Sequence, residues 1–191
     1  MKKFFSLIVM AVMCTCFVSC GNDDDNNGPV VNDPVFSSVK GTLSLKFTEA
    51  TLNLANVVVS YPNSEGKMVG ESVLKPDWKK TVDVNKPISE FEFQVFITKM
   101  PVIDISDNNP TFSTAADGTK YAHLGLDEIE LSMVSCDQNG QDLSGFRVLT
   151  KSTSDKKSDE INEFFEVHAS GPYYSWAAVF DKNGKGSEKN K

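Results

Sequence analysis

The sequence predicts an all-β domain, and three observations lead to that prediction. Apolar and polar residues alternate from Val39 to Phe47 and again from Glu90 to Ile97, which is typical of strands with one face in water. Clusters of Pro, Asn, Asp and Gly separate such segments at short intervals. No window combines a helical apolar stripe with end caps. We therefore expect roughly nine to eleven short strands in an immunoglobulin-like β-sandwich of two antiparallel sheets.

Turn residues bound each expected strand. Pro62-Asn63-Ser64-Glu65-Gly66 joins the second strand to the third as a hairpin. Asn139-Gly140 predicts a tight hairpin turn, because both central residues of such a turn take a positive φ. Phe164-Phe165-Glu166-Val167 favours a strand over a helix for its segment. The expected strands are residues 39–47, 51–61, 67–74, 80–84, 90–97, 121–124, 128–136, 146–149, 161–169 and 173–180.

The same strands could instead close into a lipocalin-like β-barrel that holds a small apolar ligand. In that alternative the first and last strands pair, and the interior is a cavity rather than a packed core. Either arrangement is a single domain over residues 36–181, large enough to bury about 70% of its unfolded surface. Residues 182–191 are polar, and we expect them to be a disordered C-terminal tail.

The N-terminal segment has the pattern of a secretory signal peptide. Lys2 and Lys3 precede an apolar run from Phe4 to Met13, which is too short to span a bilayer as a helix. The run ends at Phe17-Val18-Ser19-Cys20, which resembles the lipobox of bacterial lipoproteins. The resemblance implies that residues 1–19 are removed and that Cys20 carries acyl chains such as palmitate, which anchor stably when several are present.

An acidic run follows Cys20 at once. Asp23-Asp24-Asp25 lies in a stretch rich in Asn, Gly and Pro, and this composition predicts a flexible acidic tether over residues 20–35. The run is similar to the acidic segment after the lipidated cysteine in surface-exposed lipoproteins of Bacteroidetes. This resemblance implies an outer-membrane, lipid-anchored and surface-exposed protein, with the periplasmic face of that membrane as the alternative.

The charge of the chain limits its partners. The 191 residues include 19 basic and 26 acidic side chains, for a formal net charge of −7. An acidic protein is a poor ligand for nucleic acid, because phosphate contacts rest on clustered Lys and Arg. We therefore expect no nucleic-acid partner, and attachment to the membrane through the lipid anchor.

No constellation of residues predicts catalysis or a cofactor. His123 and His168 have no second His or Cys at metal-ligand spacing, and Cys136 reads as a small packed side chain. Gly-x-Ser-x-Gly and glycine-rich phosphate loops are absent. Glu128 and Glu130 would share one strand face, whereas glycoside hydrolysis needs carboxylates on opposite sides of the bond. We expect a protein that is not an enzyme, with an envelope glycan hydrolase as the enzymatic alternative.

Two loops have weak calcium character. Asp137-Gln138-Asn139-Gly140-Gln141-Asp142 places oxygen donors at alternate positions, but it lacks the full series of a calcium loop. Asp104, Ser106 and Asp107 form a second cluster of the same kind. The turn interpretation of the first loop is the stronger one, so we expect no metal site.

Four aromatic residues are the candidate ligand contacts. Tyr and Trp near strand ends can form a carbohydrate or peptide surface, since they combine an apolar face with a polar edge. The alternative is that they close the ends of the core. We expect a non-catalytic binding or accessory module with an unknown protein or glycan ligand. The candidate ligand-binding residues are Trp78, Tyr173, Tyr174 and Trp176.

Overall fold

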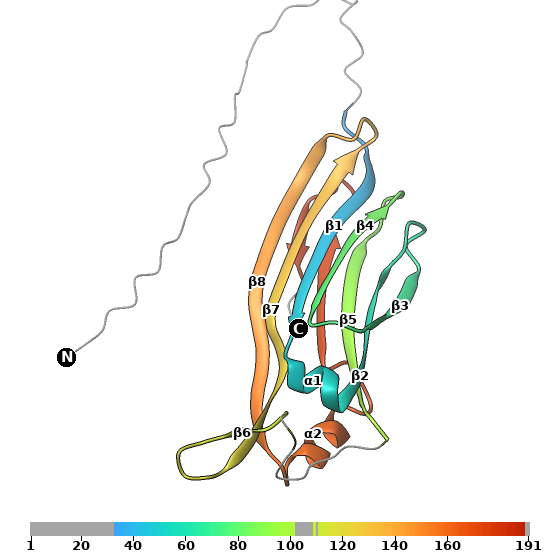
Figure 1. Ribbon diagram of the computed structural model, residues 1–191. Helices are drawn as coiled ribbons and strands as arrows, with labels where there is room; N and C mark the ends of the chain where they lie inside the picture. The colour runs from blue at the N-terminus through green and yellow to red at the C-terminus, as the bar shows by residue number, and fades with distance from the viewer. Residues whose placement is uncertain (1–32, 102–108, 110, 190–191) are drawn as a thin grey trace, which may run out of the picture. The chain divides into compact units, whose positions relative to one another are not determined.

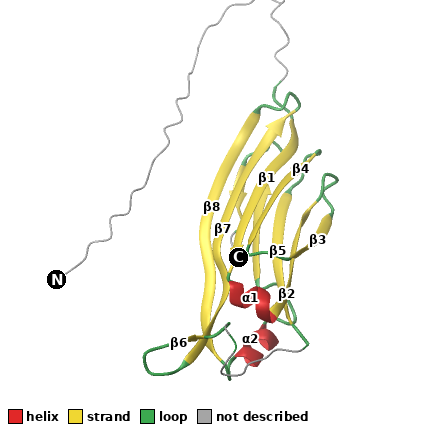
Figure 2. Cartoon of the chain, in the orientation of Figure 1, coloured by secondary structure: helices red, strands yellow, loops and turns green. Residues whose placement is uncertain are grey.

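The computed structural model describes residues 33–101, 109 and 111–189, and these form a β-sandwich of two antiparallel sheets (Figures 1 and 2). Sheet A has the order β4-β1-β7-β8, with the short β6 also paired to β7. Its strands are β1 (Phe36–Phe47), β4 (Asp77–Val84), β6 (Ser113–Thr114), β7 (Lys120–Asp137) and β8 (Asp142–Lys157). Sheet B has the order β10-β9-β5-β2-β3. Its strands are β2 (Ala55–Pro62), β3 (Met68–Val73), β5 (Glu90–Lys99), β9 (Tyr174–Phe180) and β10 (Gly186–Glu188).

The core lies between the two sheets and follows from the alternation in the sequence. Leu43 of β1 pairs with Leu131 of β7, and both are buried, while the flanking residues of each strand face outward. Phe91 and Phe93 of β5 supply the opposite side of the core and are fully buried. The predicted all-β sandwich is confirmed. The lipocalin-like alternative is wrong for the described residues, because the two sheets stay separate and do not close into a barrel.

Six strands have the neighbours of an immunoglobulin sandwich. In sheet A, β1 and β4 take the places of strands B and E of that fold. In sheet B, β2, β3, β5 and β9 take the places of C, C′, F and G. The departure is the β7–β8 hairpin, which follows β5 in the chain but occupies the position beside β1 where strand A would lie.

Two helices replace segments that the sequence predicts as strand. Helix α2 (Ile161–Val167) buries Ile161, Phe164 and Phe165, which is the spacing of one helical face. The side chain of its N-cap residue, Glu160, makes no capping hydrogen bond, so the usual start signal is missing. Helix α1 (Glu49–Leu54) takes the first part of the strand expected from residue 51, and it begins where the Thr48 hydroxyl accepts a hydrogen bond from the Thr51 amide at 3.2 Å.

The hairpin turn after β7 has a geometry that differs from the predicted one. Asp137 Oδ1 accepts hydrogen bonds from the amides of Asn139 and Gln141, both at 2.8 Å. Gly140 has a φ of +78°, whereas Asn139 does not have a positive φ. The prediction that both central residues take a positive φ is therefore wrong. The hairpin is closed instead by a turn in which only Gly140, after the central residues, has a positive φ.

The ordered domain extends beyond the boundary predicted at residue 181. Strand β10 lies inside the segment that we expected to be a disordered tail, and it pairs with β9 through Gly186, Ser187 and Glu188. The segment is tied down by side chains as well, since Lys189 Nζ contacts both carboxylate oxygens of Glu90. In the part of the chain that the structure describes, no helix has the length and hydrophobicity of a membrane span.

Candidate functional site

A hollow of about 450 Å³ lies along the edge of β9 in sheet B. The next strand, β10, pairs only with residues 178–180 of β9, and the Lys189 amide adds one more bond to the Ala177 carbonyl. Four consecutive residues of β9 line the hollow. Side chains alternate between the faces of a strand, so a hollow that touches all four follows the strand edge rather than one face. Its lining residues are Glu90, Glu92, Tyr174, Ser175, Trp176, Ala177, Glu188 and Lys189.

Trp176 forms the floor of this hollow. Its side chain is 5% exposed, and its ring lies 5.6 Å from that of Phe146, measured between centroids. Because Phe146 belongs to β8, this contact joins sheet A to sheet B beside the hollow. The indole N–H donates to Glu188 Oε1 at 2.9 Å, so the polar edge of the ring points to the rim.

Tyr174 is the half-buried neighbour of Trp176. Its ring packs against Phe93 with centroids 5.7 Å apart. Burial, and to a lesser degree the negative charge of Glu188, raises the pKa of the Tyr174 hydroxyl. Among the described residues this hydroxyl forms no hydrogen bond. The hollow therefore contains one phenol that can still donate and accept.

Carboxylates line the hollow together with these two aromatic residues. Glu90 binds the Lys189 ammonium at 2.8 Å, and this pair raises the pKa of Lys189. Glu92 accepts one hydrogen bond from Gln94 Nε2 at 2.9 Å. Glu90, Glu92 and Lys189 lie on the outer face of sheet B, whereas Glu188 lies on the same face as Trp176. The lining of the hollow thus holds three carboxylates and one ammonium, so its net charge is negative.

The other two predicted contact residues lie elsewhere. Trp78 is on β4 of sheet A, where its ring packs against Tyr61 and its indole N–H donates to Glu71 Oε1 at 3.2 Å. Tyr173 precedes β9, and its hydroxyl donates to the Ser152 carbonyl at 2.6 Å. The four aromatic residues therefore do not form one patch. Only Tyr174 and Trp176 share a hollow.

The Glu71 carboxylate gathers three donors around Trp78. Besides the indole, it accepts the Tyr61 hydroxyl and the Lys80 ammonium, each at 2.7 Å. Lys80, then Tyr61, holds the pKa of Glu71 below its usual range, and Glu71 in turn raises the pKa of Lys80. Since β3 and β4 belong to different sheets, these bonds close the side of the sandwich opposite β9.

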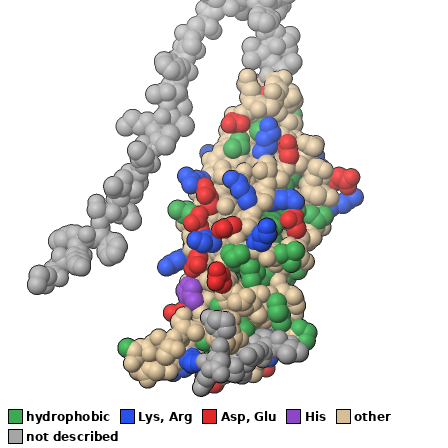
Figure 3. Space-filling model, in the orientation of Figure 1, with side chains coloured by type: hydrophobic (Ala, Val, Ile, Leu, Met, Phe, Trp, Pro, Cys, Tyr) green, Lys and Arg blue, Asp and Glu red, His purple; other side chains and the backbone are tan. Residues whose placement is uncertain are grey.

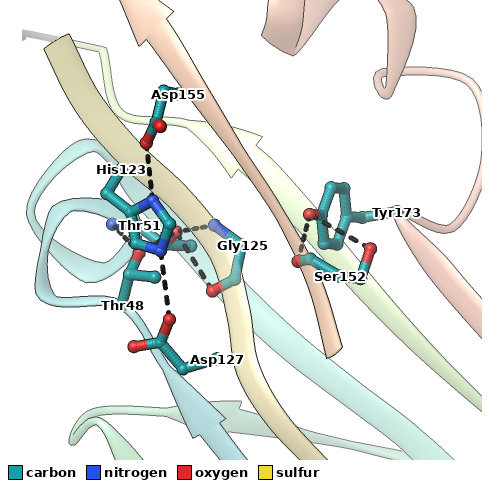
Figure 4. A network of polar contacts seen from close by, with 8 residues as sticks. All are labelled: Thr48, Thr51, His123, Gly125, Asp127, Ser152, Asp155 and Tyr173. Carbon is teal, nitrogen blue, oxygen red and sulfur yellow. Dashed lines mark hydrogen bonds and ion pairs between the residues drawn. The ribbon is translucent and has the colours of Figure 1, made fainter. Parts of the chain in front are cut away.

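A second polar network lies where β7 runs past the end of β1 (Figure 4). Gly125 has a φ of +118° at this point. Its amide donates to Thr51 Oγ1 at 2.7 Å, and its carbonyl accepts the Thr48 amide at 3.1 Å, which fastens helix α1 to β7. On the other side of Gly125 lie the Ser152 carbonyl and the Tyr173 hydroxyl.

His123 belongs to the same network and lies between two carboxylates (Figure 4). Nδ1 lies 2.6 Å from Asp155 Oδ1, and Nε2 lies 3.1 Å from Asp127 Oδ1. Hydrogen bonding to Asp155, and then to Asp127, raises the pKa of His123, because both partners favour the imidazolium. The two carboxylates approach opposite edges of the imidazole ring, so the two ring nitrogens and the two carboxylates cannot all bind one metal ion. The arrangement is that of an ion pair across the β7–β8 hairpin.

The remaining candidate groups are packed or solvated. His168 contacts the rings of Phe164 and Tyr173, and burial lowers the pKa of its imidazole. Cys136 is buried, which raises the pKa of its thiol. Burial therefore disfavours the thiolate that nucleophilic chemistry would need.

Glu128 and Glu130 lie on the outer face of sheet A, as the spacing predicts, and Glu130 pairs with Arg147 at 2.6 Å. Acidic and basic side chains are interspersed over this face (Figure 3). Neighbouring carboxylates on an exposed face do not flank a scissile bond from opposite sides. They form part of a solvated surface.

The two loops with calcium character have different outcomes. The Asp137 carboxylate accepts two backbone amides and the Asn139 side chain, so it serves the hairpin turn. These amides, with Gln141 contributing most, lower the pKa of Asp137. The cluster of Asp104, Ser106 and Asp107 lies outside the described residues, as does Cys20.

The described residues define a β-sandwich domain with an acidic, aromatic hollow on one sheet edge. Comparison of the chain with protein-family models, with curated proteins and with solved structures finds no match. The residues that sequence reasoning missed are Glu188 and Lys189, which fall in the expected tail, and the Asp155 partner of His123. That partner depends on the strand register, which pairs residue 123 with residue 155.

Proposed function

We propose that this chain is a lipid-anchored, non-catalytic binding module of the bacterial cell envelope. The lipobox-like segment ending at Cys20 and the acidic run after it support the anchor and an outer-membrane, surface-exposed location. The β9 hollow supports the binding role, and it is the single observation that carries it. Two of the four aromatic residues that the sequence marks line this hollow, together with polar groups that still have bonding capacity.

The anchor is tested by labelling and fractionation. Cells that express the protein are given a radioactive or alkyne-bearing palmitate, and the chain is isolated before and after Cys20→Ser. We expect label and membrane association only with the cysteine, and Cys14→Ser, the same change outside the lipobox-like segment, serves as the control. Mature Cys20→Ser protein that still partitions with membranes would contradict the proposal.

The binding role is tested by thermal stabilisation. A ligand that binds only the folded state raises the unfolding midpoint by mass action. The full chain is screened against soluble glycans, short peptides and small amines, and each hit is repeated with Tyr174→Phe. We expect at least one ligand whose stabilisation depends on the Tyr174 hydroxyl, with Tyr121→Phe as the matched control. If every hit stabilises all three proteins equally, the hollow is not the binding site.

A further inference from the structure

Some oxygen atoms in the β9 hollow accept no hydrogen bond from the described residues. Glu188 uses Oε1 for the Trp176 indole, and Glu92 uses Oε1 for Gln94. For the second oxygen of each carboxylate, the described residues provide no donor. The Tyr174 hydroxyl has no hydrogen bond within that part of the chain either. Two carboxylate oxygens and one phenol oxygen can therefore accept bonds from a ligand.

The apolar part of the hollow does not suit a sugar ring. Carbohydrates bind on aromatic faces that are open to solvent. The indole of Trp176 is 5% exposed and is covered by Phe146, so it offers an edge rather than a face. The ring of Tyr174 is held against Phe93. The ring positions thus favour a compact group inserted beside the aromatic edges over a flat group stacked on them.

The charge of the hollow favours a cation, and the chain itself supplies an example. The ammonium of Lys189 already binds Glu90 in the hollow, through two contacts of 2.8 and 2.9 Å. A volume of about 450 Å³ is in the range of small-ligand sites and far exceeds the size of a metal ion. An organic cation brings several N–H donors, which can bind the open oxygens of Glu188 and Tyr174 on one side of the strand edge and that of Glu92 on the other.

We propose that the β9 hollow binds an ammonium or guanidinium group, presented by a lysine or arginine side chain or by a small polyamine. This inference rests on the proposed binding function and names the ligand class of the same site. Lys189 then acts as a competitor inside the hollow, because it neutralises Glu90. The open oxygens of Glu92 and Glu188 receive the ligand's donors.

The experiment uses the indole N–H signals of the full chain in an NMR titration. The protein has two tryptophans, so two signals are expected, and Trp78→Phe assigns them. Trp176 lies in the hollow and Trp78 on the opposite side of the sandwich, which makes Trp78 an internal control. The titrants are arginine amide, spermidine, a short Lys- and Arg-containing peptide, its Glu-containing counterpart, and a neutral oligosaccharide.

We expect the cations to shift the Trp176 signal and to leave the Trp78 signal in place. One solvated ion pair contributes up to about 1 kcal/mol, which is about fivefold in affinity. Glu92→Gln and Glu188→Gln should therefore each weaken binding by about fivefold. Lys189→Met should tighten it by a similar factor, an increase that damage to the fold would not produce. Glu128→Gln, on the outer face of the other sheet, should change nothing.

The outcomes separate the ligand class from the binding function. Binding of the peptide alone identifies a protein side chain as the source of the cation, and binding of spermidine as well identifies soluble amines. If only the acidic peptide or the oligosaccharide shifts Trp176, the cation inference fails and the binding function stands. If no titrant moves Trp176, both fail. The inference would also be overturned if Glu128→Gln and Glu188→Gln weakened cation binding equally. Such a result would show that the cations respond to the net charge of the protein and not to a specific site.

Discussion

Replacing Gly125 by alanine should destabilise the domain far more than the same change at Gly118 or Gly171. The φ of +118° is a conformation that residues with a side chain rarely adopt. A Cβ at this position would overlap the Ser152 carbonyl oxygen and the Tyr173 hydroxyl, which bond to each other. The substitution therefore combines backbone strain with the displacement of β8 from β7.

The expected cost follows from these parts. Backbone strain of this kind costs about 1–3 kcal/mol. Loss of the partly buried hydrogen bond between Tyr173 and Ser152 adds about 1 kcal/mol, and overpacking adds at least as much. The sum is about 3–5 kcal/mol, a large fraction of the ~5–15 kcal/mol that stabilises a typical domain. With a urea dependence of about 2 kcal/mol per molar, the unfolding midpoint should fall by roughly 1.5–2.5 M.

The other two glycines serve as controls in the same urea titration. Gly118 has a φ of +82° and open space where a Cβ would lie, so its alanine variant should show strain alone, about 1–2 kcal/mol. Gly171 has open space and no positive φ, so its alanine variant should be nearly neutral. If Gly125→Ala falls within about 1 kcal/mol of Gly118→Ala, the close packing around Gly125 is not what the structure indicates.

Three further predictions concern single side chains. Glu71→Gln should lower the free energy of unfolding in urea by about 1–2 kcal/mol, because its donors lose a charged acceptor, while Glu65→Gln should leave it unchanged. Because the pKa of Glu71 is lowered in the folded state, this stabilisation is present at neutral pH. It is lost as the pH falls through the pKa of the folded state. The raised pKa of His123 gives the opposite pH dependence. Its ion pairs stabilise the fold below its ordinary pKa of 6.5, and this stabilisation is lost as the pH rises through the pKa of the folded state. His123→Gln should therefore reduce the change in the free energy of unfolding between about pH 5.5 and 8.5. Phe164→Ala should cost about 3–5 kcal/mol by calorimetry, whereas Val167→Ala on the exposed side of the same helix should be neutral. The Glu71 contacts are refuted if Glu71→Gln leaves the free energy of unfolding unchanged, and the His123 ion pairs are refuted if His123→Gln leaves its pH dependence unchanged. The packing of Phe164 is refuted if Phe164→Ala and Val167→Ala have equal effects.

The sheet architecture was predictable because burial in a sandwich has period two. Val39 to Phe47 and Glu90 to Ile97 alternate in sequence, and their apolar members are the core of the two sheets. Helix α2 was not predictable by the same logic. Two adjacent phenylalanines have high strand propensity, and only the end of the sandwich, which buries Ile161 with both of them, makes the helix favourable.

The candidate site was predictable only in part. Tyr174 and Trp176 were identified because aromatic residues near a strand end are typical of contact surfaces. Their partners Glu188 and Lys189 were not, because a stretch of Gly, Ser, Glu and Lys has the composition of a tail. The order of this stretch comes from pairing with β9 and from the bond to the Trp176 indole, both of which are tertiary contacts.

Strand β8 is an edge along its sixteen residues, since β7 is its only strand partner among the described residues. On a membrane that held many copies through the proposed lipid anchor, the molecules would meet side by side, and a bare edge would let them fuse into a continuous sheet. The edge carries Arg147, Lys151, Asp155 and Lys157, all exposed. Joining two such edges would crowd and desolvate these charges. Under the proposed lipid anchoring, the molecules should thus remain separate from one another even at high surface density.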